Sequence, residues 1–217
     1  MTGMGAAALA PLLACAREAE QGAAMAPGRL IVGTTCPATP RQTEGPFYFD
    51  PKRVRRDIRD GRPGLPMRLR LQVVRATDCA PVAGTRVEIW HCDSTGAYSG
   101  YDSERTAGEA WLRGAQLADA SGVATFETIF PGWYPGRATH VHCKAWLPAG
   151  RGEIATQLYF PDSLADEVHS QNPYRRTGRS LRNGEDGIFS SLGGGALMAE
   201  VRRGSAGLDA ALVLALR

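Results

Sequence analysis

Two histidines separated by one residue could bind a metal ion. His140 and His142 lie in the stretch 139–146, which is typical of a β-strand. Residues i and i+2 of a strand project from the same face, so both imidazoles can reach one point. Such a pair binds zinc, copper, nickel or iron and does not choose among them. The alternative is two partly buried histidines that are hydrogen-bonded to backbone carbonyls.

Acidic residues and cysteines do not complete this pair. A ferrous facial triad typically has Asp or Glu two residues after the first histidine, where His142 stands. The nearest acids, Glu127 and Glu153, fall on separate predicted strands. Cys143 adjoins His142, so strand alternation points it away from the pair. A two-histidine zinc hydrolase would also need a third ligand.

Two tyrosines could supply the missing ligands. Tyr134 precedes His140 by six residues, in a segment, 131–136, that two prolines and two glycines keep irregular. Tyr98 follows a turn at 93–96, just after a predicted strand. A single tyrosine is more often a core or rim residue. Two phenolates beside two imidazoles, however, form a hard anionic donor set that favours Fe(III), whose field promotes loss of the phenol proton.

The order of these residues resembles the intradiol ring-cleavage dioxygenases, the family of protocatechuate 3,4-, catechol 1,2- and hydroxyquinol 1,2-dioxygenase. The resemblance extends from about Thr43 to Phe189 and is strongest to short, single-domain, often exported members. The spacing from Tyr134 to His140 is shorter than in the familiar catabolic enzymes. The matching segments are Thr43-Glu-Gly-Pro-Phe-Tyr48, the stretch 87–98, Pro131-Gly-Trp-Tyr134, Arg137-Ala-Thr-His140-Val-His142 and Thr156-Gln-Leu-Tyr-Phe160.

The resemblance implies a mononuclear non-haem Fe(III) centre with Tyr98 and His142 as equatorial ligands and Tyr134 and His140 as axial ligands. Tyr134 would leave the metal when substrate binds and help to take its proton. Two further residues would act on the substrate: Arg137 would stabilise its negative charge, and Gln157 would hydrogen-bond near the reacting carbons. A surface ion pair is the alternative role for Arg137. The implied reaction is cleavage of a catechol-type ring by O2 to a cis,cis-muconate-type diacid.

Short segments between turns predict an all-β fold around these residues. Residues 67–74 alternate, with Leu69, Leu71 and Val73 on the buried face of a half-buried strand. Further strands are expected at 85–92, 123–129, 139–146 and 153–160, and a short helix at 163–168 inside a long polar loop, 162–189. Residues 196–202 and 208–216 contain helix formers, but the glycines around them favour two closing strands. The predicted fold class is an antiparallel β-sandwich with long loops and few short helices.

The composition is that of an ordinary globular protein. The chain has 217 residues and a net charge of +3, and arginines alternate with acids at 53–60, which disfavours nucleic-acid binding. We divide it into an N-terminal extension, residues 1–40, and one domain, residues 41–217. The expected partners are a small catechol-type molecule and O2, and the sequence leaves open whether the protein forms an oligomer.

The N-terminal extension favours export. Residues 4–14 are small and apolar, and Leu12-Leu-Ala-Cys15 is similar to a lipoprotein processing box. Residues 1–5 lack the basic charge of a signal peptide, so export requires a basic start upstream of Met1. A periplasmic, lipid-anchored or extracellular location is expected, with the cytoplasm as the alternative; a membrane is a partner only if Cys15 carries lipid. In an exported protein, Cys36 and Cys79 are candidates for a disulfide.

Two other functions compete with ring cleavage. A non-catalytic, transthyretin-like sandwich needs no metal, but it leaves four ligand positions in order unexplained. A cupin-like metal hydrolase shares the His-x-His pattern, but it gives the tyrosines no role. Outside the proposed centre, His91 is expected to point outward from the Trp90 strand, and His169 to be exposed in the polar loop.

Overall fold

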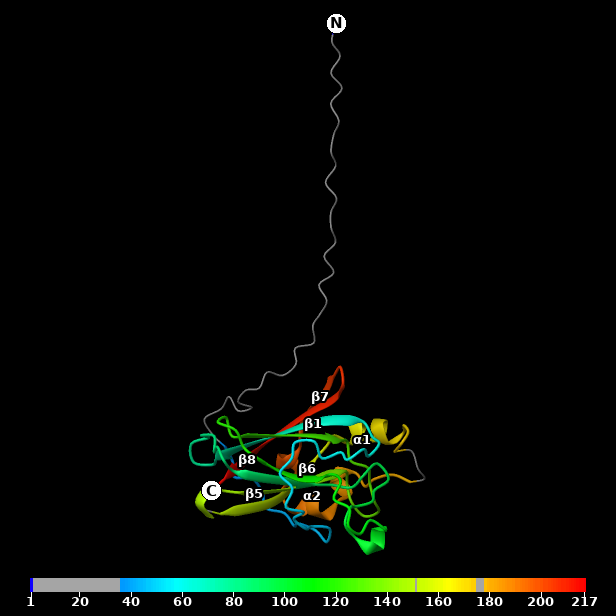
Figure 1. Cartoon of the computed structure of the whole chain (residues 1–217), viewed down its shortest axis with the longest axis horizontal. Coiled ribbons are helices and arrows are strands. Elements are labelled where there is room, and N and C mark those ends of the chain that lie inside the picture. The colour runs from blue at the N-terminus through cyan, green and yellow to red at the C-terminus, as the bar shows by residue number, and fades with distance from the viewer. Residues whose placement is uncertain (2–35, 151, 175–177) are drawn as a thin grey trace.

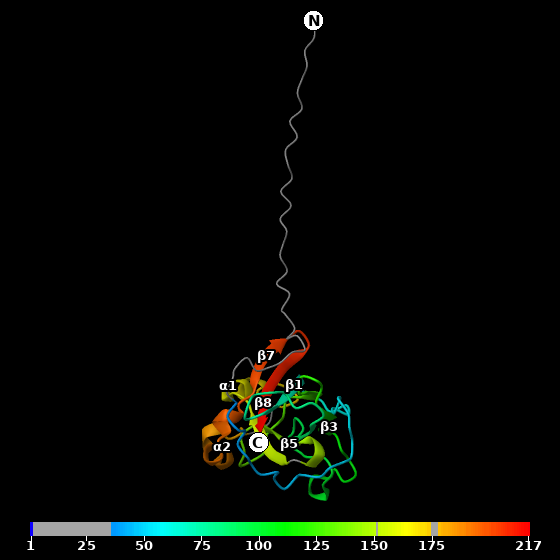
Figure 2. The ribbon, with the colours of Figure 1, turned by 90° about the vertical axis from the view of Figure 1, so that its left-hand side faces the viewer.

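The chain folds into two four-stranded β-sheets packed face to face (Figures 1 and 2). A computed structural model describes Met1 and residues 36–150, 152–174 and 178–217. One sheet has the order β4 (Val123–Ile129), β1 (Pro66–Arg75), β8 (Gly207–Leu216) and β7 (Glu200–Gly204). The other has the order β3 (Arg113–Leu117), β2 (Arg86–Trp90), β5 (His140–Trp146) and β6 (Glu153–Tyr159). The predicted all-β sandwich is confirmed.

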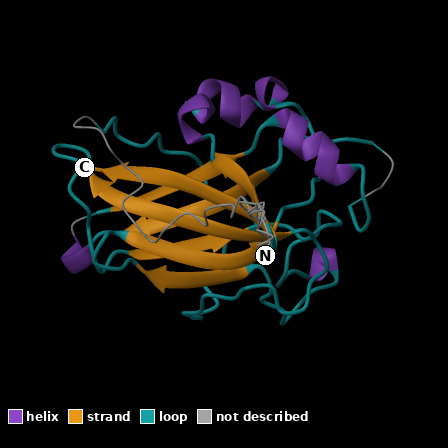
Figure 3. Cartoon of the chain, turned by 90° about the horizontal axis from the view of Figure 1, so that it is seen from above, coloured by secondary structure: helices purple, strands orange, loops and turns teal. Residues whose placement is uncertain are grey.

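The helices are short and belong to the segments that connect the strands, at the periphery of the two sheets (Figure 3). The α-helices are α1 (Asp162–His169) and α2 (Gly187–Ser191), and the 3-10 turns are η1 (Asp102–Glu104), η2 (Pro148–Gly150), η3 (Asn183–Glu185) and η4 (Gly194–Leu197). Within the described ranges, no helix has the length and apolar character needed to cross a bilayer.

Strand β1 shows how the core forms. Leu69, Leu71 and Val73 are fully buried and belong to one apolar cluster with residues of the opposite sheet. Burying each such side chain stabilises the fold by about 1.5–3 kcal/mol. The outward positions differ from expectation, because Arg70 and Gln72 are buried as well. As an inner strand, β1 is flanked at both edges by β4 and β8, and Gln72 donates a hydrogen bond to the carbonyl of Ser121.

Sheet topology differs from the prediction in one pairing. Strands β1 and β8 run parallel, whereas the other strand pairs of the two sheets are antiparallel. The two closing strands, β7 and β8, are confirmed. Strand β3 and helix α2 were not predicted, because Arg113–Leu117 has no apolar alternation and α2 has only five residues.

The register of the second sheet places aromatic and polar side chains next to each other on one face. Trp90 of β2 pairs with His142 of β5, which in turn pairs with Gln157 of β6. One row further, His140 pairs with Tyr159. Because paired residues project from the same face, these side chains lie side by side on the sheet.

Residues 36–49 form an N-terminal strap over this face. A disulfide joins Cys36 to Cys79, the pair expected for an exported protein. Gln42 N donates to Ala155 O at 3.0 Å, which adds the strap to the β6 edge. The extension's lipid-attachment candidate, Cys15, lies outside the described residues, as does the rest of 2–35.

Candidate metal centre

Strand β5 presents His140 and His142 to a single point. Their Nε2 atoms lie 3.1 Å apart, and both side chains are buried. His140 Nδ1 lies 2.6 Å from Ala138 O, so this nitrogen carries the proton and Nε2 keeps its lone pair. Burial, with the Arg137 charge as the next contribution, lowers the pKa of His140 to about 3. The ring is therefore neutral at physiological pH and able to bind a metal.

The stacking of Trp90 fixes the second imidazole. The Trp90 and His142 rings are nearly parallel, 4° apart, with centroids separated by 5.0 Å. His142 Nδ1 has no hydrogen-bond partner in the part of the chain that the structure describes. Burial lowers the pKa of His142 well below its ordinary value, and the neighbouring His140 contributes.

Both predicted tyrosines lie beside this pair. The Tyr134 hydroxyl donates to His140 Nε2 at 3.1 Å. Tyr98 is fully buried, and its ring centroid lies 5.7 Å from that of Tyr134 and 6.3 Å from that of His142. The Tyr98 hydroxyl makes no well-formed hydrogen bond to any described residue, although Tyr134 lies close enough to influence its pKa.

These four side chains fit a cation. Two imidazole Nε2 atoms lie 3.1 Å apart beside a buried phenol that forms no hydrogen bond, and buried polar atoms without partners cost free energy unless a ligand such as a cation satisfies them. Burial raises the pKa of both phenols, so a highly charged metal is needed to ionise them. Among the described residues, no group of three or more His, Cys, Asp or Glu could hold a metal. Fe(III) suits the donor set of two phenolates and two imidazoles.

A buried aspartate locks together the two segments that carry the tyrosines. The Asp93 carboxylate accepts hydrogen bonds from Thr95 N and Ala97 N in the turn before Tyr98, and forms an ion pair with Arg62. The Asp93 carbonyl accepts a hydrogen bond from Gly132 N, two residues before Tyr134. A Cβ at Gly132 would lie 2.3 Å from that carbonyl oxygen, so only glycine allows this close approach.

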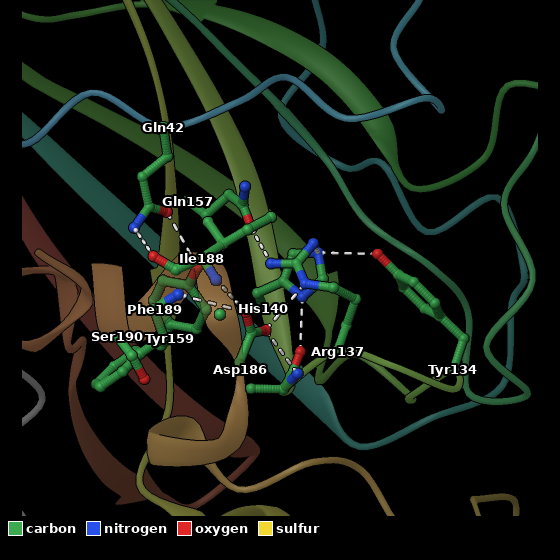
Figure 4. A network of polar contacts seen from close by, with 12 residues as sticks. Gln42, Tyr134, Arg137, His140, Gln157, Tyr159, Asp186, Ile188, Phe189 and Ser190 are labelled. Carbon is green, nitrogen blue, oxygen red and sulfur yellow. Dashed lines mark hydrogen bonds and ion pairs between the residues drawn. The ribbon is translucent and has the colours of Figure 1, made fainter. Parts of the chain in front are cut away.

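Arg137 and Gln157 lie together at the edge of the centre. Arg137 Nη1 is 3.4 Å from His140 Nε2, and Nη2 donates to Gln157 Oε1 (Figure 4). Arg137 Nε also pairs with Asp186 Oδ2 at 2.9 Å, and these side chains are only 15% and 1% exposed. The ion pair considered for Arg137 therefore exists, but it is buried.

Three residues of this network were not predicted: Asp186, Tyr159 and Gln42. The Tyr159 hydroxyl lies 3.0 Å from Gln42 Oε1 and 3.3 Å from Gln157 Oε1. Asp186 begins α2 as its N-cap, and an aspartate before a short apolar run is a recognisable cap signal. Nothing in the local sequence indicates its pairing with Arg137, 49 residues away.

The predictions for the two remaining histidines were wrong. His91 is fully buried, with Nδ1 2.8 Å from Cys92 O and Nε2 2.7 Å from Thr128 Oγ1. Strand β2 ends at Trp90, so the alternation used to place His91 outward stops one residue too early. His169 is partly buried, with Nε2 3.0 Å from Pro131 O.

Comparison with known proteins identifies the family. A family model described as Dioxygenase matches residues 43–173, more than half of the chain. An intradiol ring-cleavage dioxygenase from Tetranychus urticae has a TM-score of 0.79 and 32% identity, over 84% of this chain and 95% of that one. The chain belongs to the intradiol ring-cleavage dioxygenase family.

Other members of the family are also similar. The dioxygenase domain of a dioxygenase carbohydrate-binding fusion from Streptomyces sp. SirexAA-E has a TM-score of 0.63 and 33% identity, over 83% of this chain and 99% of that one. A catechol 1,2-dioxygenase from Pseudomonas sp. (strain EST1001) is 38% identical over 44% of this chain and 32% of the relative. The match thus spans about a third of that curated relative.

Proposed function

We propose that the protein cleaves a catechol-type ring with O2, between the two hydroxyl-bearing carbons, at a mononuclear non-haem Fe(III) centre. The observation that carries this proposal is the convergence of two phenols and two neutral imidazoles on one buried point. Tyr98, Tyr134, His140 and His142 would hold the iron. Bound there, Fe(III) would withdraw electron density from a coordinated catecholate and make its ring carbons reactive toward O2.

The chain's own residues perform the remaining steps. Tyr134 is less buried than Tyr98, so it is the phenol better placed to meet a substrate and accept a hydroxyl proton. Arg137 brings a guanidinium beside His140, where it stabilises negative charge on the ring as the reaction proceeds. Gln157 accepts from Arg137 and donates to Thr43 O at 3.0 Å, so its amide orientation is fixed.

The substrate class is a catechol. Relatives of this chain are named for catechol, hydroxyquinol and chlorocatechol. We propose a substituted or unsubstituted catechol, with protocatechuate, hydroxyquinol and lignin-derived catechols as the set to screen. The expected product is a cis,cis-muconate-type dicarboxylic acid that contains both atoms of one O2 molecule.

Colour, metal content and oxygen uptake together test this function. Phenolate bound to Fe(III) absorbs visible light strongly, so we expect a red to burgundy protein with one iron per chain. Oxygen uptake with a panel of catechols under 18O2 should yield a diacid carrying two labelled oxygens. A colourless zinc protein would favour a metal hydrolase, and a colourless protein that takes up no metal would favour a binding module.

We also propose that the protein works in an oxidising compartment, outside the cytoplasm. The support is the Cys36–Cys79 disulfide, since such bonds persist mainly in exported proteins. Fractionation of the native host should recover the protein outside the cytoplasm. Recovery in the cytoplasm with both thiols free would contradict this location.

A further inference from the structure

Asp186 is a buried carboxylate near the proposed centre, and both of its oxygens accept hydrogen bonds. It is 1% exposed and comes from the segment before α2, outside the sandwich. Oδ2 accepts from Arg137 Nε at 2.9 Å and from Ala138 N at 2.8 Å. Oδ1 accepts from Ile188 N at 2.8 Å and Phe189 N at 3.3 Å. The two oxygens therefore have separate partners. Oδ2 holds Arg137 and the backbone of Ala138, whereas Oδ1 caps α2.

We propose that Asp186 is a positioning residue for the ring-cleavage reaction, which holds the Arg137 guanidinium against the metal centre. This inference rests on the proposed function and deepens it. Arg137 bonds with three groups through different nitrogens: Asp186 through Nε, Gln157 through Nη2 and His140 through Nη1. With Nε and Nη2 held, Nη1 is the nitrogen directed at His140. Loss of the Nε contact would free the guanidinium to rotate away.

A series of polar contacts, completed by the backbone of α2, supports this placement, and Figure 4 shows part of it. Gln157 Oε1 accepts from Arg137 and lies 3.3 Å from the Tyr159 hydroxyl, which itself lies 3.0 Å from Gln42 Oε1. Gln42 Nε2 donates to Leu192 O at 3.1 Å, at the end of α2. Asp186 is the N-cap of the same helix, which links this series of contacts back to Arg137. The arginine is thus held by two segments outside the sheets, α2 and the N-terminal strap.

The charge of Asp186 suits this role. Burial alone would raise its pKa, but the Ala138 N–H and the Arg137 charge hold that pKa below the ordinary value. The carboxylate therefore stays ionised opposite the guanidinium. The competing interpretation is that Asp186 is only a helix cap, whose contact with Arg137 does not affect the reaction.

Two substitutions separate these interpretations because they keep the cap. In Asp186→Asn, the amide oxygen can accept from Ile188 N, but the amide NH2 then faces the Arg137 donors and repels them. In Asp186→Ser, the hydroxyl caps the helix and the second oxygen is absent. Asn and Ser are as good as Asp at an N-cap, so both variants should fold. The matched control is Glu185→Gln, which alters the neighbouring exposed acid that pairs with Arg179.

Steady-state kinetics on the full, iron-loaded chain test the proposal. We expect both Asp186 variants to lower kcat by about 100-fold, since a displacement of about 1 Å can cost that much. KM, iron content and the visible band should stay within about twofold of the parent, as should every property of Glu185→Gln. In an Arg137→Ala background, Asp186→Asn should cause no further loss of kcat, because both substitutions remove the same Asp186–Arg137 interaction.

Three outcomes would overturn the proposal. One is an Asp186→Asn protein with parental kcat. Another is a full further loss in the Arg137→Ala background, which would show that Asp186 acts independently of Arg137. The third is a loss of iron equal to the loss of activity, which would indicate a purely structural role. An inactive, colourless parent would overturn the proposed function itself, so the two failures are distinguishable.

Discussion

The ring of Phe47 lies flat on the ring of Tyr98, with centroids 4.4 Å apart and planes 8° apart. Phe47 belongs to the N-terminal strap, whereas Tyr98 follows the turn after β2. The contact therefore joins a segment outside the sheets to a proposed iron ligand. It also covers a buried phenol that has no hydrogen-bond partner among the described residues.

Removal of this ring should weaken both the fold and the centre. We expect Phe47→Ala to lower the free energy of unfolding by about 2 kcal/mol, from lost apolar burial and ring stacking. Urea titration measures this change, and the visible band of the iron-loaded variant should weaken in parallel. Leu117→Ala is the control, since Leu117 is 61% exposed and its loss should change stability by less than about 0.5 kcal/mol. Equal stabilities of the two variants would contradict a role for the stack.

Tyr134 and Tyr101, whose rings both contact Phe47, offer a matched test of the proposed ligand set. Tyr134→Phe should keep iron, shift the visible band and lower kcat by about 100-fold, because a phenolate and a proton acceptor are lost together. Tyr101→Phe removes a hydroxyl that donates to Tyr48 O at 3.1 Å, outside the centre, so it should keep the parental colour and activity. A Tyr134→Phe protein with the parental spectrum would remove Tyr134 from the metal.

His140→Ala should have a different effect from Tyr134→Phe. It removes an uncharged proposed ligand whose position is fixed by β5 and by the Ala138 carbonyl, and the described residues contain no other cluster of three or more His, Cys, Asp or Glu that could hold the metal. We expect the variant to fold but to retain less than about a tenth of the parental iron. Metal analysis of the purified protein checks this, and a fully loaded variant would exclude His140 as a ligand.

The parts of the fold that could be predicted depend on local patterns. Strands β1, β4 and β5 alternate or form compact apolar runs between turns, so their positions follow from short-range chemistry. The parallel pairing of β1 with β8 joins segments that are far apart in sequence, and no local pattern specifies it. His91 was placed wrongly because alternation holds only while the strand continues, and β2 ends one residue earlier.

In the candidate centre, too, some residues could be predicted from local sequence and others could not. His140 and His142 share a face because of their spacing, so their convergence could be expected from the sequence. Tyr98 and Tyr134 became candidates because a pair of phenols would complete the donor set, and the family resemblance then implied their roles, since neither turn by itself indicates a metal. The pairing of Asp186 with Arg137 depends on where α2 packs, which is a tertiary property without a sequence pattern of its own.

Gly132 provides a test of how the two tyrosine segments are held together. A methyl group at this position would lie 2.3 Å from Asp93 O, so Gly132→Ala must push the two loops apart. We expect a loss of about 2 kcal/mol or more in the free energy of unfolding, and weaker iron binding. Gly184→Ala is the control, because its Cβ meets nothing within 4 Å. If Gly132→Ala matched this control in stability and iron affinity, the Asp93–Gly132 contact would not matter.

The Cys36–Cys79 disulfide should stabilise the chain and hold the strap. The two cysteines are 43 residues apart, and closing a loop of that length contributes about 4 kcal/mol by chain entropy. We expect the double substitution Cys36→Ala with Cys79→Ala to lose a comparable free energy of unfolding and to lower kcat through the loosened strap. Substitution is better than a thiol reductant here, because a reductant would also act on ferric iron. A double variant as stable as the parent would show that the strap is held without the bond.

Buried His91 should make stability depend on pH. Burial lowers its pKa to about 4 in the folded protein, whereas an unfolded histidine titrates near its ordinary value of 6.5. Between these values the unfolded chain binds more protons, so stability is lost as the pH falls from about 6.5 to about 4. The shift corresponds to about 3 kcal/mol as an order of magnitude. His91→Asn, a neutral side chain whose amide can take the place of Nδ1 opposite Cys92 O, should lack this contribution.

Urea titrations of parent and His91→Asn at several pH values isolate the contribution of His91. Other buried histidines titrate in both proteins, so their effects cancel in the difference between the two free energies of unfolding. We expect the parent's advantage to be largest at pH 7 and to fall steadily toward pH 4.5, because only the parent must exclude a proton from residue 91. A difference that stays constant over this range would mean that His91 is protonated to the same extent in the folded and unfolded chains.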